Sequence, residues 1–351
     1  MCIGSFFGCR IEVESVGKST GLSPCETSPD LLEDPESPHN EAPAHGAHPG
    51  VYERQTDRMT DFEPRSMVGL LPIHSHLIQA GDLQAVVGDG VRNGVGGTQY
   101  CGLWSLTSRH RVFNAFGNSF AGLLPGELRG RRTFLEELDA TSAVLTREPD
   151  RQRQSRTRAL YRVEAPFTIH HELTLCDEAD LRAPGCSFRE VSWCNYMNSP
   201  DDPRLHFLAD GQWLRYIPPS HGIHSNVAPA SVPDDELEKW PNTGEGRPFH
   251  WHRVPFRFDE PFYYGRIGDM VLLLVFDQPQ WLRFFSSPSG GGGAIQSERT
   301  CPAWDFEWVI PEGEYMPGRD FTFRVRMIYK RFHSDDDILL EVQKAQQILH
   351  G

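Results

Sequence analysis

Hydrophobic and polar residues alternate in short runs from Leu70 onward, and Gly, Pro, Asn and Asp residues separate these runs. Between Phe321 and Tyr329, apolar residues occupy every second position, which is the period of a half-buried β-strand. The run MVLLLVF at 270–276 is apolar throughout and predicts a central strand covered on both faces. Similar runs predict further strands at 83–87, 168–175, 188–197, 205–217, 281–285 and 304–310.

Many short strands separated by turns, without alternating helices, predict an all-β sandwich or barrel. One helix is expected, at the end of the chain. Ser334 can cap this helix, and the three aspartates at 335–337 suit the positive end of its dipole. We expect it to pack on the sheet through one apolar stripe, made of Ile338, Leu339, Val342, Ala345, Ile348 and Leu349.

The first 66 residues differ in composition from the rest. They contain seven prolines and twelve Asp and Glu against five Lys and Arg, so they carry −7 of the total charge of −14. Such a segment buries too little apolar surface to offset the entropy lost on ordering. We therefore predict a disordered acidic head at 1–67, a β domain at 68–333, and a helix packed on it at 334–351.

Charge and hydropathy exclude some classes of partner. An acidic chain lacks the basic surface that nucleic acids require. No run of 18 apolar residues is present, so no membrane span is expected, and the first ten residues do not form a classical signal peptide. The chain is expected to be soluble and, by default, cytoplasmic. Its eight cysteines include no CxxC pair, so we expect reduced core residues, with a disulfide possible among Cys176, Cys186 and Cys194.

Histidines are concentrated in one part of the chain, with seven of the fifteen between positions 170 and 252. His221 and His224 form one close pair, and His250 and His252 form another, followed by Arg253. Residues at i and i+2 of a strand share a face, so the second pair could bind a divalent metal or transfer protons. The alternative is a surface turn with incidental histidines. No cofactor is otherwise indicated.

Two carboxylates share a face at the end of the β domain. Asp305 and Glu307 alternate with three aromatic residues that suit the core, namely Trp304, Phe306 and Trp308. A carboxylate pair flanked by aromatics suits sugar hydroxyl recognition or acid/base chemistry, although a solvated strand face would have the same pattern. The segment 93–123 adds amides and aromatic rings suited to a saccharide, chiefly Asn93, Gln99, Tyr100 and Trp104. His171, on the predicted strand at 168–175, is a further candidate.

Several motifs resemble galactose-mutarotase-like β-supersandwich proteins, a group that includes uncharacterised bacterial members. The resemblance covers roughly 68–333 and is carried by the strand at 83–87, GGTQYCGLWSL at 96–106, AGL at 121–123, PAWDFEWVIP at 302–311, and the strand that follows Gly318. It implies a twisted, two-sheet antiparallel β-supersandwich with a carbohydrate site in its concave sheet. Members include aldose epimerases, polysaccharide lyases, glycoside hydrolases and non-catalytic sugar-binding domains.

Epimerases of this group use a histidine acid and a glutamate base, but their motifs do not match this chain residue by residue. Lyases of the group use His, Tyr and Arg, and Tyr263 and Arg266 are residues of these types. The fold is an analogy for function rather than a demonstration of it.

Three hypotheses follow. The first is an enzyme (lyase, hydrolase or epimerase) acting on a sugar or uronate-containing glycan by histidine-based acid/base chemistry. The second is a non-catalytic carbohydrate-binding domain, and the third is a metal site built from the four paired histidines. For the enzyme, the candidate catalytic residues are His221, His224, His250, His252, Arg253 and Glu307. The candidate substrate-binding residues are Asn93, Gln99, Tyr100, Trp104, His171, Tyr263, Arg266 and Asp305.

Overall fold

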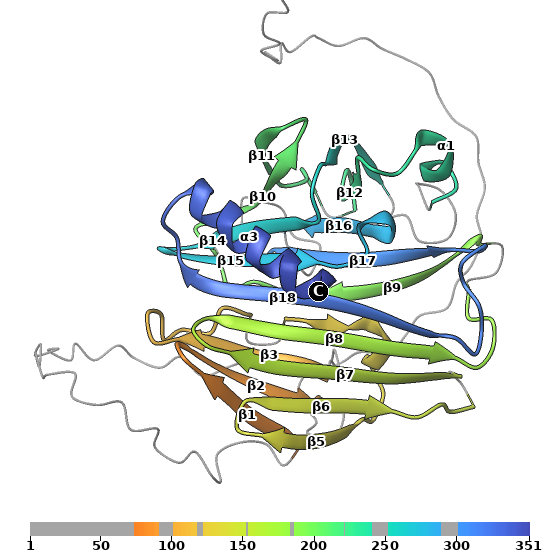
Figure 1. Ribbon diagram of the computed structural model, residues 1–351, viewed down its shortest axis with the longest axis horizontal. Coiled ribbons are helices and arrows are strands. Elements are labelled where there is room, and N and C mark those ends of the chain that lie inside the picture. The colour runs from red at the N-terminus through yellow and green to blue at the C-terminus, as the bar shows by residue number, and fades with distance from the viewer. Residues whose placement is uncertain are drawn as a thin grey trace, which may run out of the picture. The chain divides into compact units, whose positions relative to one another are not determined.

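The computed structural model describes eight parts of the chain, namely 74–90, 101–117, 122–151, 154–182, 186–220, 222–240, 252–288 and 301–351. These parts belong to one compact unit, Pro64–Gly351. The predicted head at 1–67 lies outside the described residues. Within them the chain forms three β-sheets, and the predicted all-β sandwich with a C-terminal helix is confirmed (Figure 1).

The largest sheet has nine antiparallel strands. Their order is β11 (Gln212–Tyr216), β10 (Asp202–Ala209), β14 (Phe262–Ile267), β15 (Met270–Phe276), β18 (Asp320–Arg331), β8 (Thr168–Asp177), β7 (Ser155–Glu164), β6 (Ser142–Arg147) and β5 (Phe134–Asp139). As predicted, β15 is buried at every position. The alternating residues of β18 from Phe321 to Tyr329 are also buried in the core.

A six-stranded sheet faces the nine-stranded one. Its order is β13 (Arg253–Phe258), β12 (Asn226–Pro229), β16 (Leu282–Ser287), β17 (Ala303–Pro311), β9 (Phe188–Cys194) and β4 (Leu124–Pro125). Its strands pair antiparallel except for β12 and β13. Three short helical turns lie in the connections, namely η1 (Gly126–Leu128), α1 (Asp234–Leu237) and η2 (Pro279–Trp281).

Aromatic rings join the two large sheets. Phe306 of β17 lies 4.7 Å from Phe276 of β15, and Trp308 of β17 lies 4.8 Å from Phe323 of β18, measured between ring centroids. The third sheet contains β1 (Ser75–Ala80), β2 (Leu83–Asp89) and β3 (Cys101–Ser108), and its apolar side chains join the same core. Because the inward positions of β17 are taken up by this core, its alternate residues must point outward.

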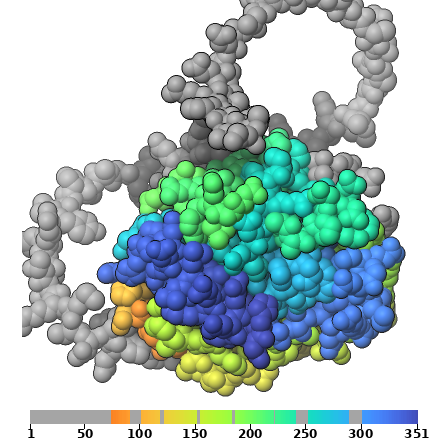
Figure 2. Space-filling view, turned by 45° about the horizontal axis from the view of Figure 1, so that its top comes forward, coloured from red at the N-terminus to blue at the C-terminus, as the bar shows by residue number. Residues whose placement is uncertain are grey.

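Helix α3 (Asp335–His350) covers the outward face of β14, β15 and β18 (Figures 1 and 2). Ser334 caps it as predicted, because its hydroxyl accepts a hydrogen bond from the Asp337 N–H at 3.2 Å. The predicted apolar stripe holds except at Ile348, which is 57% exposed, since it lies on the side of the helix away from the sheet. Among the described residues, no helix is long and apolar enough to cross a membrane.

The sequence predicted a single strand at 205–217, where the structure has two. The structure divides them into β10 and β11 at Asp210 and Gly211, whose φ angles are +52° and +71°. This left-handed dipeptide makes the tight hairpin turn that Asp-Gly favours. Cys176, Cys186 and Cys194 are all free thiols, so the possible disulfide among them is absent.

Candidate functional site

The outward face of β17 carries the strongest concentration of buried polar chemistry in the described chain. Along this face the strand reads Ala303, Asp305, Glu307 and Val309, so two acids lie between two apolar residues. Asp305 is only 6% exposed and Glu307 only 3% exposed. Burying a carboxylate is costly unless partners compensate, so the partners of these two groups indicate what the face can do.

Glu307 lies in a polar network with residues of three other strands of the sheet. Arg283 of β16 is directly opposite it, and its Nε forms an ion pair with Glu307 Oε1. Arg283 Nη2 also contacts Glu190 Oε2 of β9 at 3.4 Å. Asn226 of β12 donates from Nδ2 to Glu307 Oε1 at 3.3 Å. This network orients the carboxyl group from one side.

The environment of Glu307 shifts its pKa toward neutral pH. The pKa of Glu307 is raised to about 8 in all, because burial, followed by the Glu190 carboxylate, raises it more than Arg283 lowers it. A carboxyl group that titrates near neutral pH can both accept and release a proton there. The arrangement therefore suits general acid/base chemistry.

Asp305 has a different environment. Its Oδ1 accepts a hydrogen bond from the Asn195 backbone N–H at 2.6 Å. Asn195 is itself held in place, because its side chain bonds the Leu123 N–H and the Trp304 carbonyl. Burial, with a smaller contribution from Glu307, raises the pKa of Asp305 well above its ordinary value. Asp305 thus favours its neutral, protonated form.

Two apolar clusters flank the carboxyl pair. The first contains Leu124, Tyr196 and Ala303, with Trp104, Cys194 and Cys301 packed against them. The second contains Phe188, Ala228, Val232, Leu237, Trp240 and Val309. Trp104 is half-buried and packs against the first of these clusters. An aromatic face next to polar groups can pack against the C–H face of a sugar.

The structure brings His224 and His252 together beside this network. Their rings stack 4.2 Å apart, and the His224 N–H donates to His252 Nδ1 at 3.0 Å. The His252 carbonyl accepts from the Asn226 N–H at 3.1 Å, so Asn226 connects the histidine pair to Glu307. Burial, together with His224, lowers the pKa of His252. His252 is therefore neutral at physiological pH.

Arg253 lies on the same sheet, opposite Asn226. Its Nη1 donates to the Leu237 carbonyl at 2.7 Å, which ties α1 to the sheet. Burial, then the nearby charges of Arg283 and Arg257, lower the pKa of Arg253. Three guanidinium groups thus occur near one another around the second apolar cluster.

Three predicted residues lie away from this network, and we leave them out of the site. His171 is fully buried between the sheets, where its Nδ1 is 2.9 Å from the Leu160 carbonyl and its Nε2 accepts from the Trp193 indole. Tyr263 is also in the core and donates to the Trp304 carbonyl. Arg266 stacks on the ring of Phe332, near α3.

Five predicted residues, His221, His250, Asn93, Gln99 and Tyr100, lie outside the described residues. The metal hypothesis needs two of them. Within the described ranges, no group of three or more His, Cys, Asp or Glu side chains could hold a metal ion.

The sequence analysis missed Arg283, Asn226, Asn195 and Glu190. For Arg283 a signal was present, since an arginine inside the apolar run 281–285 must have a buried partner or point away from the core. The other three depend on cross-strand register, which the pattern of a single strand does not contain.

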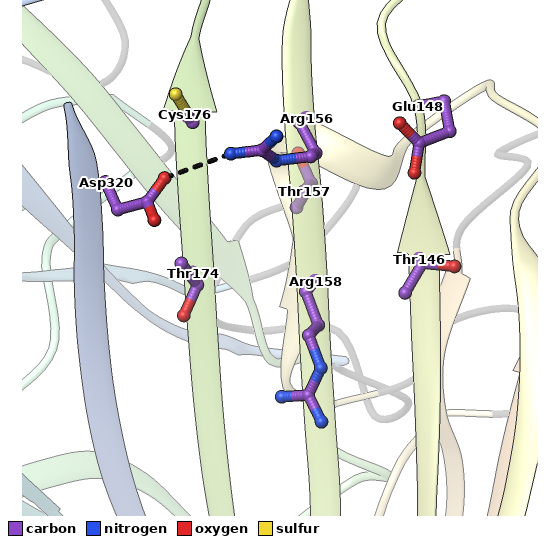
Figure 3. Close-up of a pocket in the computed structure, with 8 residues that line it drawn as sticks. All are labelled: Thr146, Glu148, Arg156, Thr157, Arg158, Thr174, Cys176 and Asp320. Carbon is purple, nitrogen blue, oxygen red and sulfur yellow. Dashed lines mark hydrogen bonds and ion pairs between the residues drawn. The ribbon is translucent and has the colours of Figure 1, made fainter. Parts of the chain in front are cut away.

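A separate depression of about 290 Å³ lies on the outward face of the nine-stranded sheet (Figure 3). Arg156 pairs there with Asp320 at 3.3 Å, and both side chains are more than half exposed. None of the predicted site residues lines this depression. Because this ion pair is exposed to solvent, the depression is a weaker candidate for catalysis.

Comparison with known proteins gives likenesses of fold. No protein-family model matches the sequence, and no curated protein matches it significantly. Similar solved structures include a candidate aldose 1-epimerase from Escherichia coli, with 10% identity and a TM-score of 0.40 over 74% of this chain and 99% of that one. The aldose epimerase homologue from C. elegans has 8% identity and a TM-score of 0.37 over 74% and 100% of the two chains.

A candidate mutarotase from Salmonella typhimurium has 9% identity and a TM-score of 0.41 over 73% and 90% of the two chains. These neighbours are of the aldose 1-epimerase and mutarotase kind that the sequence resembles. We base the functional assignment on the residues of the site and not on these likenesses.

Proposed function

We propose that this chain is a carbohydrate-active enzyme that opens and closes the ring of a sugar hemiacetal, as an aldose epimerase does. The observation that carries the proposal is Glu307, a buried carboxyl with a pKa of about 8 on an outward sheet face. Such a group can take the proton of an anomeric hydroxyl near neutral pH. A second group then protonates the ring oxygen as the ring opens.

The surrounding residues fit this task. Arg283 and Asn226 both contact Glu307 Oε1, so they fix the direction in which the carboxyl faces. In this proposal Trp104, a half-buried aromatic residue, packs against the apolar face of the sugar, and His252, which is linked to Asn226, hydrogen-bonds a sugar hydroxyl. In this proposal the histidine pair binds substrate, and Glu307 performs the proton transfer.

The test is the interconversion of sugar anomers by the purified protein. A panel of neutral and uronate-bearing aldoses would be followed by polarimetry and by NMR of the anomeric protons. We expect Glu307→Gln to lower kcat/KM by about 100-fold or more, because general base catalysis typically contributes that much. Product analysis on glycans would reveal a lyase or hydrolase instead, since either would release shorter products.

Glu172→Gln is a matched control. Glu172 is also a glutamate paired with an arginine, Arg324, at 3.0 Å, but it belongs to the nine-stranded sheet. We expect this variant to keep wild-type kcat/KM. Wild-type turnover in Glu307→Gln, with native circular dichroism, would overturn the assignment.

A second candidate is a non-catalytic sugar-binding domain. One observation favours it: Arg283 and Asn226 both contact Glu307 Oε1. A glutamate with only a structural role would have the same contacts. This candidate predicts saturable sugar binding in calorimetry, with no change in anomer ratio or product. The same purified protein can therefore decide between the two.

A further inference from the structure

Asp305 is a buried carboxyl group without a cation beside it in the described parts of the chain. Buried carboxylates elsewhere do have one, as when Asp177 contacts Arg189 at 2.8 Å. Asp305 accepts only one described hydrogen bond, from the Asn195 N–H to Oδ1. Its Oδ2 has no partner among the described residues. This pairing pattern differs from that of Glu307, which faces Arg283.

A carboxyl group in this position holds its proton. Losing water disfavours the charged form, and the Glu307 carboxylate, two residues along the same strand, disfavours a second negative charge. The pKa of Asp305 is accordingly raised well above its ordinary value. The consequence is a carboxylic acid that holds its proton at a pH where an ordinary aspartate has lost it.

We propose that Asp305 is the proton donor of the site, and that it works in concert with Glu307 on one sugar ring. This inference rests on the proposed function and adds the identity of the second group. It gives the proton-donating role to a carboxyl on β17, whereas the sequence predicted a histidine in that role.

These two residues account for both proton transfers in the reaction. The Glu307 carboxylate takes the proton of the anomeric hydroxyl, and the freed electron pair forms the C1=O double bond. The bond from C1 to the ring oxygen breaks, and its electron pair takes the proton of Asp305. The product is an open-chain aldehyde with Glu307 protonated and Asp305 ionised. Closure on the other face of the aldehyde returns both protons.

The spacing of the pair suits this reaction. Residues at i and i+2 of a strand are about 7 Å apart and point to the same side of the sheet. The two carboxyl groups are therefore separated by about the width of one pyranose ring. Asn195, which directly follows β9, donates its backbone N–H to Asp305 Oδ1. This bond holds one oxygen of the carboxyl group, and the other oxygen has no partner among the described residues.

The first test needs no sugar. Infrared difference spectra of wild-type protein against Asp305→Asn, at neutral pH, should contain one protonated-carboxyl band assigned to Asp305. The asparagine keeps an oxygen that can accept the Asn195 N–H, so the fold should be retained. Asp277→Asn is the matched control, because Asp277 is another buried aspartate, on the opposite sheet, with its pKa raised to about 6. The absence of a band for Asp305 would overturn the proposal.

The second test is kinetic. We expect Asp305→Asn to lower kcat/KM for anomer interconversion by about 100-fold or more, with native circular dichroism, while Asp277→Asn keeps wild-type values. Asp305→Glu, which restores an acid, should recover part of the loss. If Asp305→Asn fails to fold, Asp305→Glu and the wild-type spectrum titrated with pH still decide the question.

The outcomes separate the two proposals. If the wild type interconverts anomers and Asp305→Asn does so equally well, the role of Asp305 is overturned and that of Glu307 stands. If the wild type acts on no aldose, the proposed function fails, and the step assigned to Asp305 fails with it.

Discussion

Carboxyl groups shielded from water decide the behaviour of this site at the scale of single residues. Glu307 and Asp305 are both buried. Arg283 forms an ion pair with Glu307, whereas no cation in the described parts of the chain lies beside Asp305. A protonated acid and an ionisable base can thus coexist on one strand face. Pairs of groups whose environments separate their proton affinities are a common basis for acid/base catalysis.

This difference predicts a particular pH–rate profile. Glu307 must be ionised to accept a proton, so kcat/KM should rise with pH until about pH 8, the pKa of Glu307. Polarimetric rates over a pH series, corrected for the buffer-catalysed reaction, would give the profile. A profile that is flat across neutral pH would contradict the role of Glu307.

At the scale of secondary structure, periodicity predicted about half of the described strands, because burial imposes this pattern directly. The all-apolar strand β15 and the alternating strand β18 follow from their own residues. So does the placing of Trp304, Phe306 and Trp308 in the core. The hairpin between β10 and β11 was missed because an alternating pattern continued across Asp210 and Gly211.

The site was predictable only in part. Asp305 and Glu307 were identified because they lie on one strand and share a face. Their partners Arg283, Asn226 and Asn195 come from other strands, and only cross-strand register brings them into contact. His171 was predicted as a substrate-binding residue, but it is buried in the core. Alternation assigns a residue to one face of a strand and does not tell which face is the core.

The cap of α3 gives a prediction at this scale. Ser334→Ala removes the hydroxyl that accepts the Asp337 N–H, and the helix packs on β14, β15 and β18. We expect a loss of about 1 kcal/mol in the free energy of unfolding. Urea titration followed by circular dichroism would measure it. Ser334→Asp, which can still cap, should lose much less, and equal losses in both variants would argue against a capping role.

At the scale of the whole molecule, one core serves all three sheets, so buried titrating groups affect the stability of the entire fold. Burial lowers the pKa of His171 to about 3, so the unfolded chain binds its proton first and stability falls as pH drops below about 6.5. Glu307 acts in the opposite sense. Its folded pKa of about 8 exceeds the ordinary 4.5, so stability falls as pH rises from about 4.5 to 8.

Together these two groups predict that the fold is most stable on the acid side of neutrality. One pKa unit corresponds to about 1.4 kcal/mol, so each slope amounts to a few kcal/mol at most. Glu307→Gln removes this titrating carboxyl group, so it should move the optimum to higher pH. Urea unfolding over a pH series would measure the shift. An optimum that stays in place in this variant would contradict the assigned shift of Glu307.

The edge strand β5 gives this acid optimum a practical consequence. This strand, with the sequence FLEELD, lies at the edge of the nine-stranded sheet. Phe134 and Leu138 are exposed, and the three charged residues of the strand are all acidic. Exposed sheet edges invite pairing with other chains, and charges on them prevent it. As pH falls toward the isoelectric point of about 5.5, the net negative charge of the chain declines and the repulsion between molecules weakens. The conditions that best resist unfolding are therefore those in which the protein is least soluble, so concentrated stocks should be kept at higher pH than the stability curve alone would recommend.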